Sequence, residues 1–142
     1  MKILHLVSGA TVASVLALAA NAAVLPMDAP VKFGAITAVC GGVGSDKDNG
    51  QWNAYPIKLE FSNGGAQFVS NEHVKLMNNT GATLAEFDCP GPWILLQLPQ
   101  GLYSATATIA DATRGPRTVK FQPPATGQKR VEVQFPSIAP NQ

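Results

Sequence analysis

Short segments in which apolar and polar residues alternate run through most of the chain after residue 30. In residues 55–62 (YPIKLEFS) every second residue is apolar, and residues 73–79, 82–89 and 130–135 repeat this period of two. Such a period is typical of strands that bury one face. Turn residues separate the segments at intervals of roughly ten residues, which is the spacing of strands in sandwiches and barrels. The pattern therefore predicts an all-β fold, a seven- to eight-stranded Greek-key β-sandwich of the prealbumin or immunoglobulin-like type.

The segment 92–109 (PWILLQLPQGLYSATATI) joins an apolar run to a second alternating segment. Residues 92–98 place apolar side chains on both faces, as a central strand does. Pro99 fixes one backbone angle of a turn, and Gly101 can adopt the left-handed conformation that closes a three-residue loop. We therefore predict a hairpin between two neighbouring strands. Its motif residues are Leu98, Pro99, Gly101 and Tyr103.

Residues 31–54 read as a strand followed by a loop. Residues 31–40 (VKFGAITAVC) are predicted as one strand, in which Gly34 marks either a bulge or a close approach of another backbone segment. The sequence after it is rich in glycine and aspartate. A single helical turn, capped by Ser45, fits within residues 45–54.

Residues 1–23 have the features of a secretory signal peptide. A basic residue, Lys2, precedes an apolar stretch, and Ala20 and Ala22 stand at the positions of an A-x-A cleavage site. The alternative is a membrane anchor, but small polar residues dilute the apolar stretch. We predict cleavage after about residue 22 or 23, which leaves residues 24–142 as a single β-sandwich domain in the periplasm or outside the cell.

Export places the only two cysteines, Cys40 and Cys89, in an oxidising compartment. The simplest interpretation is one disulfide between them. Metal binding is the alternative, but the processed chain contributes only one histidine, His73, to a metal site. The Asp46–Gly50 stretch also departs from the calcium-loop pattern, because glycine stands at its fifth position. We predict neither a metal nor another cofactor.

Removal of Lys2 with the signal peptide leaves basic and acidic residues equal in number. This balance does not favour nucleic acid as a partner, and no stable membrane insertion is expected after processing. The last third of the chain is basic, however: from Asp111 onward there are five basic residues against two acidic ones. These are either solvated strand faces or a surface for an acidic partner.

Catalytic residues are not predicted. Nucleophilic catalysis needs a hydroxyl or thiol beside an oriented base, and His73 stands in the polar context SNEHVK, typical of a surface histidine. A possible ligand-binding group is Trp52, Tyr55 and Asn53, because aromatic rings with amide groups are suited to sugars. The alternative is that both aromatic side chains close one end of the core.

The stretch NNTGATLAEFDCPGPWILLQLPQGLYSATATI (78–109) resembles the carboxypeptidase regulatory-like domains, relatives of the transthyretin (prealbumin) sandwich. Its Leu98-Pro99-x-Gly101-x-Tyr103 motif carries the resemblance, and CGGVGSDKD (40–48) is similar to the opening of small bacterial periplasmic members. The resemblance implies a seven-stranded Greek-key sandwich that serves as an accessory or binding module with a carbohydrate-binding-like fold. The transthyretin-like hydrolases of purine breakdown share this fold, but their C-terminal Tyr-Arg-Gly-Ser is missing here.

The sequence therefore predicts an exported, non-catalytic β-sandwich that binds a protein partner or a component of the cell envelope. A carbohydrate-binding module that uses the Trp52 and Tyr55 region is the alternative. A hydrolase with an unrecognised site is the third hypothesis.

Overall fold

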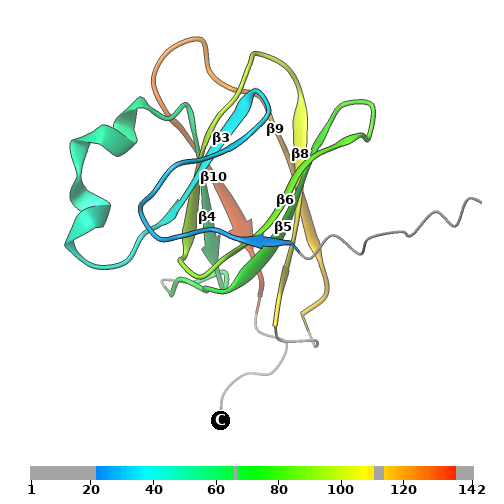
Figure 1. Ribbon diagram of the computed structural model, residues 1–142. Helices are drawn as coiled ribbons and strands as arrows, with labels where there is room; N and C mark the ends of the chain where they lie inside the picture. Colours follow the sequence, from blue (N-terminus) through cyan, green and yellow to red (C-terminus); the bar gives the residue numbers. More distant parts are fainter. Residues whose placement is uncertain (1–21, 66, 111–113, 137–142) are drawn as a thin grey trace, which may run out of the picture.

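The computed structural model describes residues 22–65, 67–110 and 114–136, and the predicted signal peptide lies almost entirely outside them. Two five-stranded sheets face each other (Figure 1). Sheet A contains, in spatial order, β1 (Ala23–Val24), β6 (Thr83–Cys89), β5 (Glu72–Asn78), β8 (Tyr103–Ile109) and β9 (Arg117–Phe121). Sheet B contains β10 (Lys129–Gln134), β4 (Ile57–Ser62), β7 (Trp93–Gln97), β3 (Ile36–Gly41) and β2 (Val31–Phe33). The predicted all-β sandwich is confirmed.

The described residues form ten strands, and two differences from the sequence prediction explain the larger number. Residues 31–40 are not one strand, because Gly34 adopts a φ of 61° and turns the chain into a β2–β3 hairpin. The predicted bulge at Gly34 is therefore wrong. In addition, β1 pairs in parallel with the end of β6, opposite Phe87 and Asp88.

The core lies between the inner faces of the two sheets. Its largest fully buried side chains include Phe61 and Phe135 from the sheet B side and Phe87 from sheet A. The predicted disulfide is confirmed: Cys40 of β3 and Cys89 of β6 are bonded, so the bridge ties sheet B to sheet A across the core. A bridge that closes a loop of this size stabilises the fold by about 4 kcal/mol in the chain-entropy account.

The predicted hairpin at residues 98–102 is wrong. β7 pairs with β3 and β4 in sheet B, whereas β8 pairs with β5 and β9 in sheet A, so the two strands are not neighbours. Gly101 has a φ of 155°, far from the left-handed value of about 57° that a closing glycine adopts. The segment instead crosses from one sheet to the other.

Tyr103 fixes this crossing. Its hydroxyl donates a hydrogen bond to the main-chain oxygen of Pro99 at 2.8 Å, and its ring stacks on Phe121 with centroids 6.0 Å apart. A tyrosine that bonds back to the chain just upstream of its strand is a recurrent corner device in β-sandwiches. Leu98, Pro99, Gly101 and Tyr103 thus form a corner between sheets.

β7 is buried on both faces, as its sequence predicts. Ile94 and Leu96 face the core, whereas Trp93 and Leu95 join Val39 in a second apolar cluster on the outer face of sheet B. Two short 3₁₀ helices, η1 (Ser45–Asp48) and η2 (Gly50–Ala54), follow β3, and η2 covers the outer cluster with Trp52. Residues 45–54 thus contain two 3₁₀ helices instead of the single predicted turn, and the side chain that caps η2 is Asn49, which accepts a hydrogen bond from the Gln51 N–H.

Gly42 is required by the same cluster. Its φ is 99°, and a Cβ at this position would overlap the indole ring of Trp93. The glycine-rich sequence after β3 therefore leaves room for the Trp93 ring rather than forming a bare turn.

In the ranges that the structure describes, no helix combines the length and the apolar character needed to cross a bilayer.

Replacing Tyr103 by phenylalanine should lower the free energy of unfolding by about 1 kcal/mol, because only the hydrogen bond to Pro99 is lost. Urea denaturation measures this change. Tyr55→Phe is the matched control and should have a smaller effect, since no hydrogen bond from the Tyr55 hydroxyl is present in the described residues. Equal effects of the two substitutions would contradict the corner role of Tyr103.

Candidate functional site

The three residues predicted to bind a ligand lie over the outer face of sheet B. Trp52 is only 4% exposed and packs on Val39, Trp93 and Leu95. Tyr55 is half-buried beside it, with ring centroids 6.0 Å apart, whereas Asn53 is exposed. The Trp52 ring is therefore committed to the outer apolar cluster and is not an open platform.

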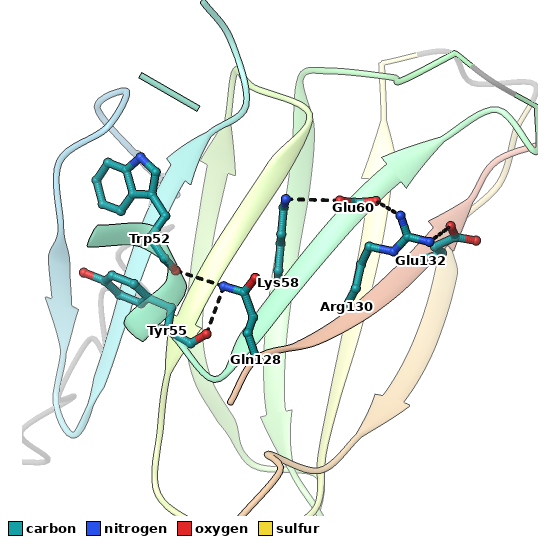
Figure 2. A network of polar contacts seen from close by, with 7 residues as sticks. All are labelled: Trp52, Tyr55, Lys58, Glu60, Gln128, Arg130 and Glu132. Atoms are coloured by element: carbon teal, nitrogen blue, oxygen red, sulfur yellow. Dashed lines mark hydrogen bonds and ion pairs between the residues drawn. The ribbon is translucent and has the colours of Figure 1, made fainter. Parts of the chain in front are cut away.

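Gln128 holds this cover in place (Figure 2). Its side-chain amide donates hydrogen bonds to the main-chain oxygens of Trp52 at 2.9 Å and of Tyr55 at 3.0 Å. Gln128 immediately precedes β10, so these bonds join η2 to an edge strand that is distant in sequence. The arrangement stabilises the cover and engages both carbonyl groups.

The other half of the same face carries a chain of ion pairs (Figure 2). Glu60 of β4 lies 3.2 Å from Lys58 and 3.4 Å from Arg130, and Arg130 lies 3.1 Å from Glu132. Lys58 also stands 4.3 Å above the centre of the Trp93 ring. Basic and acidic groups balance in this network, so it mainly supports the pairing of β10 with β4 and offers no excess charge to a ligand.

Trp52→Ala should destabilise the protein by about 3–5 kcal/mol, the usual range for truncating a buried aromatic side chain. Tyr55→Ala, which removes a half-buried ring from the same cover, should have a clearly smaller effect. Urea denaturation of both variants tests the structural role. A Trp52→Ala variant as stable as the natural protein would show that the outer cluster does not depend on this ring.

The loops at one end of the sandwich form a different kind of surface. Four connections meet there, at residues 34–35, 79–82, 98–102 and 122–128, all at the top of Figure 1. Three hollows of about 500, 580 and 470 Å³ are lined by the first three of these connections and the strands beside them, and neighbouring hollows share lining residues. We call this surface the loop end.

Two of the three hollows have largely apolar walls, whereas the third is lined mainly by polar groups, among them those of Lys32, Thr37 and Gln97. The apolar residues that line the three hollows include Phe33, Ile36, Met77, Leu84, Leu98, Pro99, Leu102 and Tyr103. Leu102 is 57% exposed, one of the few large apolar side chains of the described residues that face solvent. The ring of Tyr103, by contrast, is stacked on Phe121 and almost buried, so it offers little open surface for stacking.

Local hydrogen bonds fix the shape of the loop end. The Asn78 side-chain oxygen accepts bonds from the Thr80 N–H, the Thr80 hydroxyl and the Ala82 N–H, which fixes the β5–β6 turn. The Gln100 amide donates to the Pro124 oxygen and joins two of the loops. A surface ordered in this way loses little conformational entropy on binding.

The loop end is also free of acidic residues. None of its four connecting loops contains aspartate or glutamate, and none of the three hollows is lined by one. Lys32 and Lys120 line hollows, and Lys129 begins β10 at the same end. All three lysines are exposed, and none forms an ion pair with a described residue.

His73, on the outer face of sheet A, is engaged by two carboxylates. Its Nδ1 lies 2.7 Å from Asp88 and its Nε2 lies 2.8 Å from Glu86. The hydrogen bond to Asp88 raises the pKa of His73; burial opposes this effect and Glu86 adds to it. No group of three or more His, Cys, Asp or Glu residues in the described ranges is placed to hold a metal ion.

Among the described residues, Glu72 is the titratable group whose ionised form is most strongly disfavoured by burial. It is 1% exposed at the start of β5, opposite Cys89 and Ile109, and neither carboxyl oxygen has a hydrogen-bond partner in the described residues. Burial raises the pKa of Glu72 to about 9. The side chain is therefore neutral at physiological pH.

The pH dependence of stability tests this state of Glu72. Between its ordinary pKa of 4.5 and about 9, the folded protein retains a proton that the unfolded chain releases. Stability should therefore fall by about 1.4 kcal/mol per pH unit through this window from Glu72 alone.

Glu72→Gln keeps the shape and removes the titration, so the stability of this variant relative to the natural protein should rise with pH over the same range. Urea denaturation at a series of pH values measures the difference. A difference that does not change with pH would contradict a buried neutral carboxyl group.

Searches of family models, curated proteins and solved structures find no match to this chain. The resemblance to carboxypeptidase regulatory-like domains, and the Greek-key connectivity that accompanies it, therefore stay predictions.

Sequence reasoning selected the aromatic residues near residue 52 and missed the loop end. Leu102 was overlooked because it follows the glycine of a motif that was assigned to a hairpin. One sequence feature relates to the loop end: the last third of the chain is basic, and two of its basic residues, Lys120 and Lys129, lie at the loop end. Arg130, from the same basic group, is instead paired with Glu60 and Glu132.

Proposed function

We propose that this chain is an exported, non-catalytic β-sandwich that binds a component of the cell envelope through its loop end. The observation that carries the proposal is the coincidence, at one end of the fold, of an exposed Leu102, two adjoining hollows with largely apolar walls and exposed lysines without acidic neighbours. Apolar hollows with a few polar groups at their rims are the usual form of binding sites.

Export supports the envelope as the location of the partner. The Cys40–Cys89 disulfide suits an oxidising compartment outside the cytoplasm. The A-x-A sequence at residues 20–22 is consistent with removal of a signal peptide, after which Ala23 or Val24 begins the chain. Cleavage after Ala22 would keep both residues of β1 in sheet A, so we favour that position.

The state of His73 supports a non-catalytic role. Both ring nitrogens already face carboxylates, Asp88 and Glu86, so neither nitrogen is left to accept a proton from a nucleophile or a substrate. His73 is the only histidine that follows the predicted cleavage site. A general-base role would require one of these contacts to break.

Carbohydrate binding near residue 52 is the second hypothesis. Because Trp52 is buried, only half-buried Tyr55 and exposed Asn53 of the predicted group could contact a sugar. A glycan array separates the two hypotheses: binding that is lost on Tyr55→Ala, with the fold intact, would favour the sugar site over the loop end.

Binding of the processed protein to isolated cell envelopes tests the proposal. Leu102→Ser should weaken binding about tenfold, because an exposed leucine contributes roughly 1.5 kcal/mol when it is buried in an interface. Sedimentation of envelopes with labelled protein measures the bound fraction.

Val43→Ser is the matched control, because Val43 is also exposed, at 55%, but lies outside the loop end. Its binding should equal that of the natural protein. Envelope binding that Leu102→Ser leaves unchanged would contradict the proposed role of the loop end.

A further inference from the structure

Three exposed apolar side chains of the described residues border hollows, and the charges beside them differ. The hollow at Val24 includes Asp88 paired with His73, and the hollow at Phe68 includes Glu60 and Glu132 paired with Arg130. The hollow at Leu102 includes Lys120 and no acidic residue. An anionic partner would therefore meet no unpaired cation among the residues lining the first two hollows and attraction at the third.

The lysines of the loop end stand at separate corners of the sandwich. Lys32 belongs to β2 and Lys129 to β10, which are the two edges of sheet B, whereas Lys120 belongs to β9, an edge of sheet A. A slot for a single small anion would gather its cationic groups at one point. Cations spread over three edge strands, with an exposed apolar side chain at the same end, instead suit a broad and flat anionic partner.

We propose that the loop end docks reversibly on the surface of a bilayer that contains anionic lipids. Leu102 enters the boundary between headgroups and acyl chains, and Lys32, Lys120 and Lys129 contact the headgroup phosphates. The inference rests on the proposed function, because it names the envelope component that the loop end binds. It is compatible with a domain that is not inserted in the membrane, since a single leucine and a few lysines provide a weak peripheral anchor.

The chemistry of the end favours a lipid surface over an acidic peptide. The Thr80 and Ala82 N–H groups donate to the Asn78 side chain, and the Pro99 oxygen accepts from Tyr103. The four connections of this end contain no strand among the described residues, so they offer a peptide no strand edge to extend. The anchor is instead a leucine on a corner held by Tyr103, which resists being pushed back when Leu102 enters an apolar layer. The equal numbers of acids and bases in the processed chain leave no general attraction to anions, so any attraction must come from this local surface.

Co-sedimentation with defined vesicles tests the inference without any envelope protein. The processed protein should bind vesicles of phosphatidylcholine with phosphatidylglycerol and should not bind phosphatidylcholine alone. Raised salt should weaken the binding, because it screens the lysine contacts. Leu102→Ser should lower the partition coefficient about tenfold, and Lys120→Gln about fivefold.

Matched variants distinguish docking by the loop end from general adhesion. Phe68→Ser removes an exposed aromatic side chain next to Glu60 and Glu132 and should leave binding unchanged. Lys120→Arg keeps the charge and should retain binding. Urea denaturation midpoints equal to that of the natural protein establish that each variant is folded.

Absence of binding to the anionic vesicles would overturn the inference, as would equal losses for Leu102→Ser and Phe68→Ser. If the protein does not bind anionic vesicles but still binds envelopes in a Leu102-dependent manner, the proposed lipid partner is wrong. The proposed function then stands, with a protein as the partner. If neither vesicles nor envelopes bind, both proposals fail.

Discussion

β7 is apolar on both faces, and the rest of the structure depends on covering each of them. Sheet A covers the inner face, where Ile94 and Leu96 join the main core. The outer face, with Trp93 and Leu95, has no third layer of sheet and is covered by the short 3₁₀ segment that carries Trp52. Burial of apolar surface is the main stabilising contribution to a fold, so this segment is part of the structure in spite of its polar, loop-like sequence.

Because the outer face of β7 must be covered, the outer face of sheet B and the loop end differ in how much exposed surface they have. The outer face of sheet B is occupied on one side by the Trp52 cover and on the other by the balanced network of Lys58, Glu60, Arg130 and Glu132. The loop end has neither a cover nor internal charge balance. Its exposed Leu102 and unpaired lysines therefore remain open to solvent, which is why the proposed binding surface is placed there.

The sequence predicts much of the fold because local patterns decide it. The period of two locates the strands, export predicts the Cys40–Cys89 bridge, and the two apolar faces of β7 indicate a central strand. The corner at residues 98–102 could not be recognised in this way, because a proline followed by a glycine suits both a hairpin and a crossing between sheets. Only the pairing of β7 and β8 with other strands distinguishes them. The loop end escaped prediction for a related reason: its residues come from four separate loops, and only the packing of the sheets brings them together.

The most direct test of the cover on β7 is the fluorescence of the two tryptophans. Both residues of this type, Trp52 and Trp93, lie in the outer cluster and are 4% and 5% exposed. The account predicts that the folded, processed protein emits at the short wavelengths of buried indole and that acrylamide quenches it far less than the urea-unfolded chain. Emission and quenching of the folded protein equal to those of the unfolded chain would show that the outer face of β7 is open, and would contradict the account.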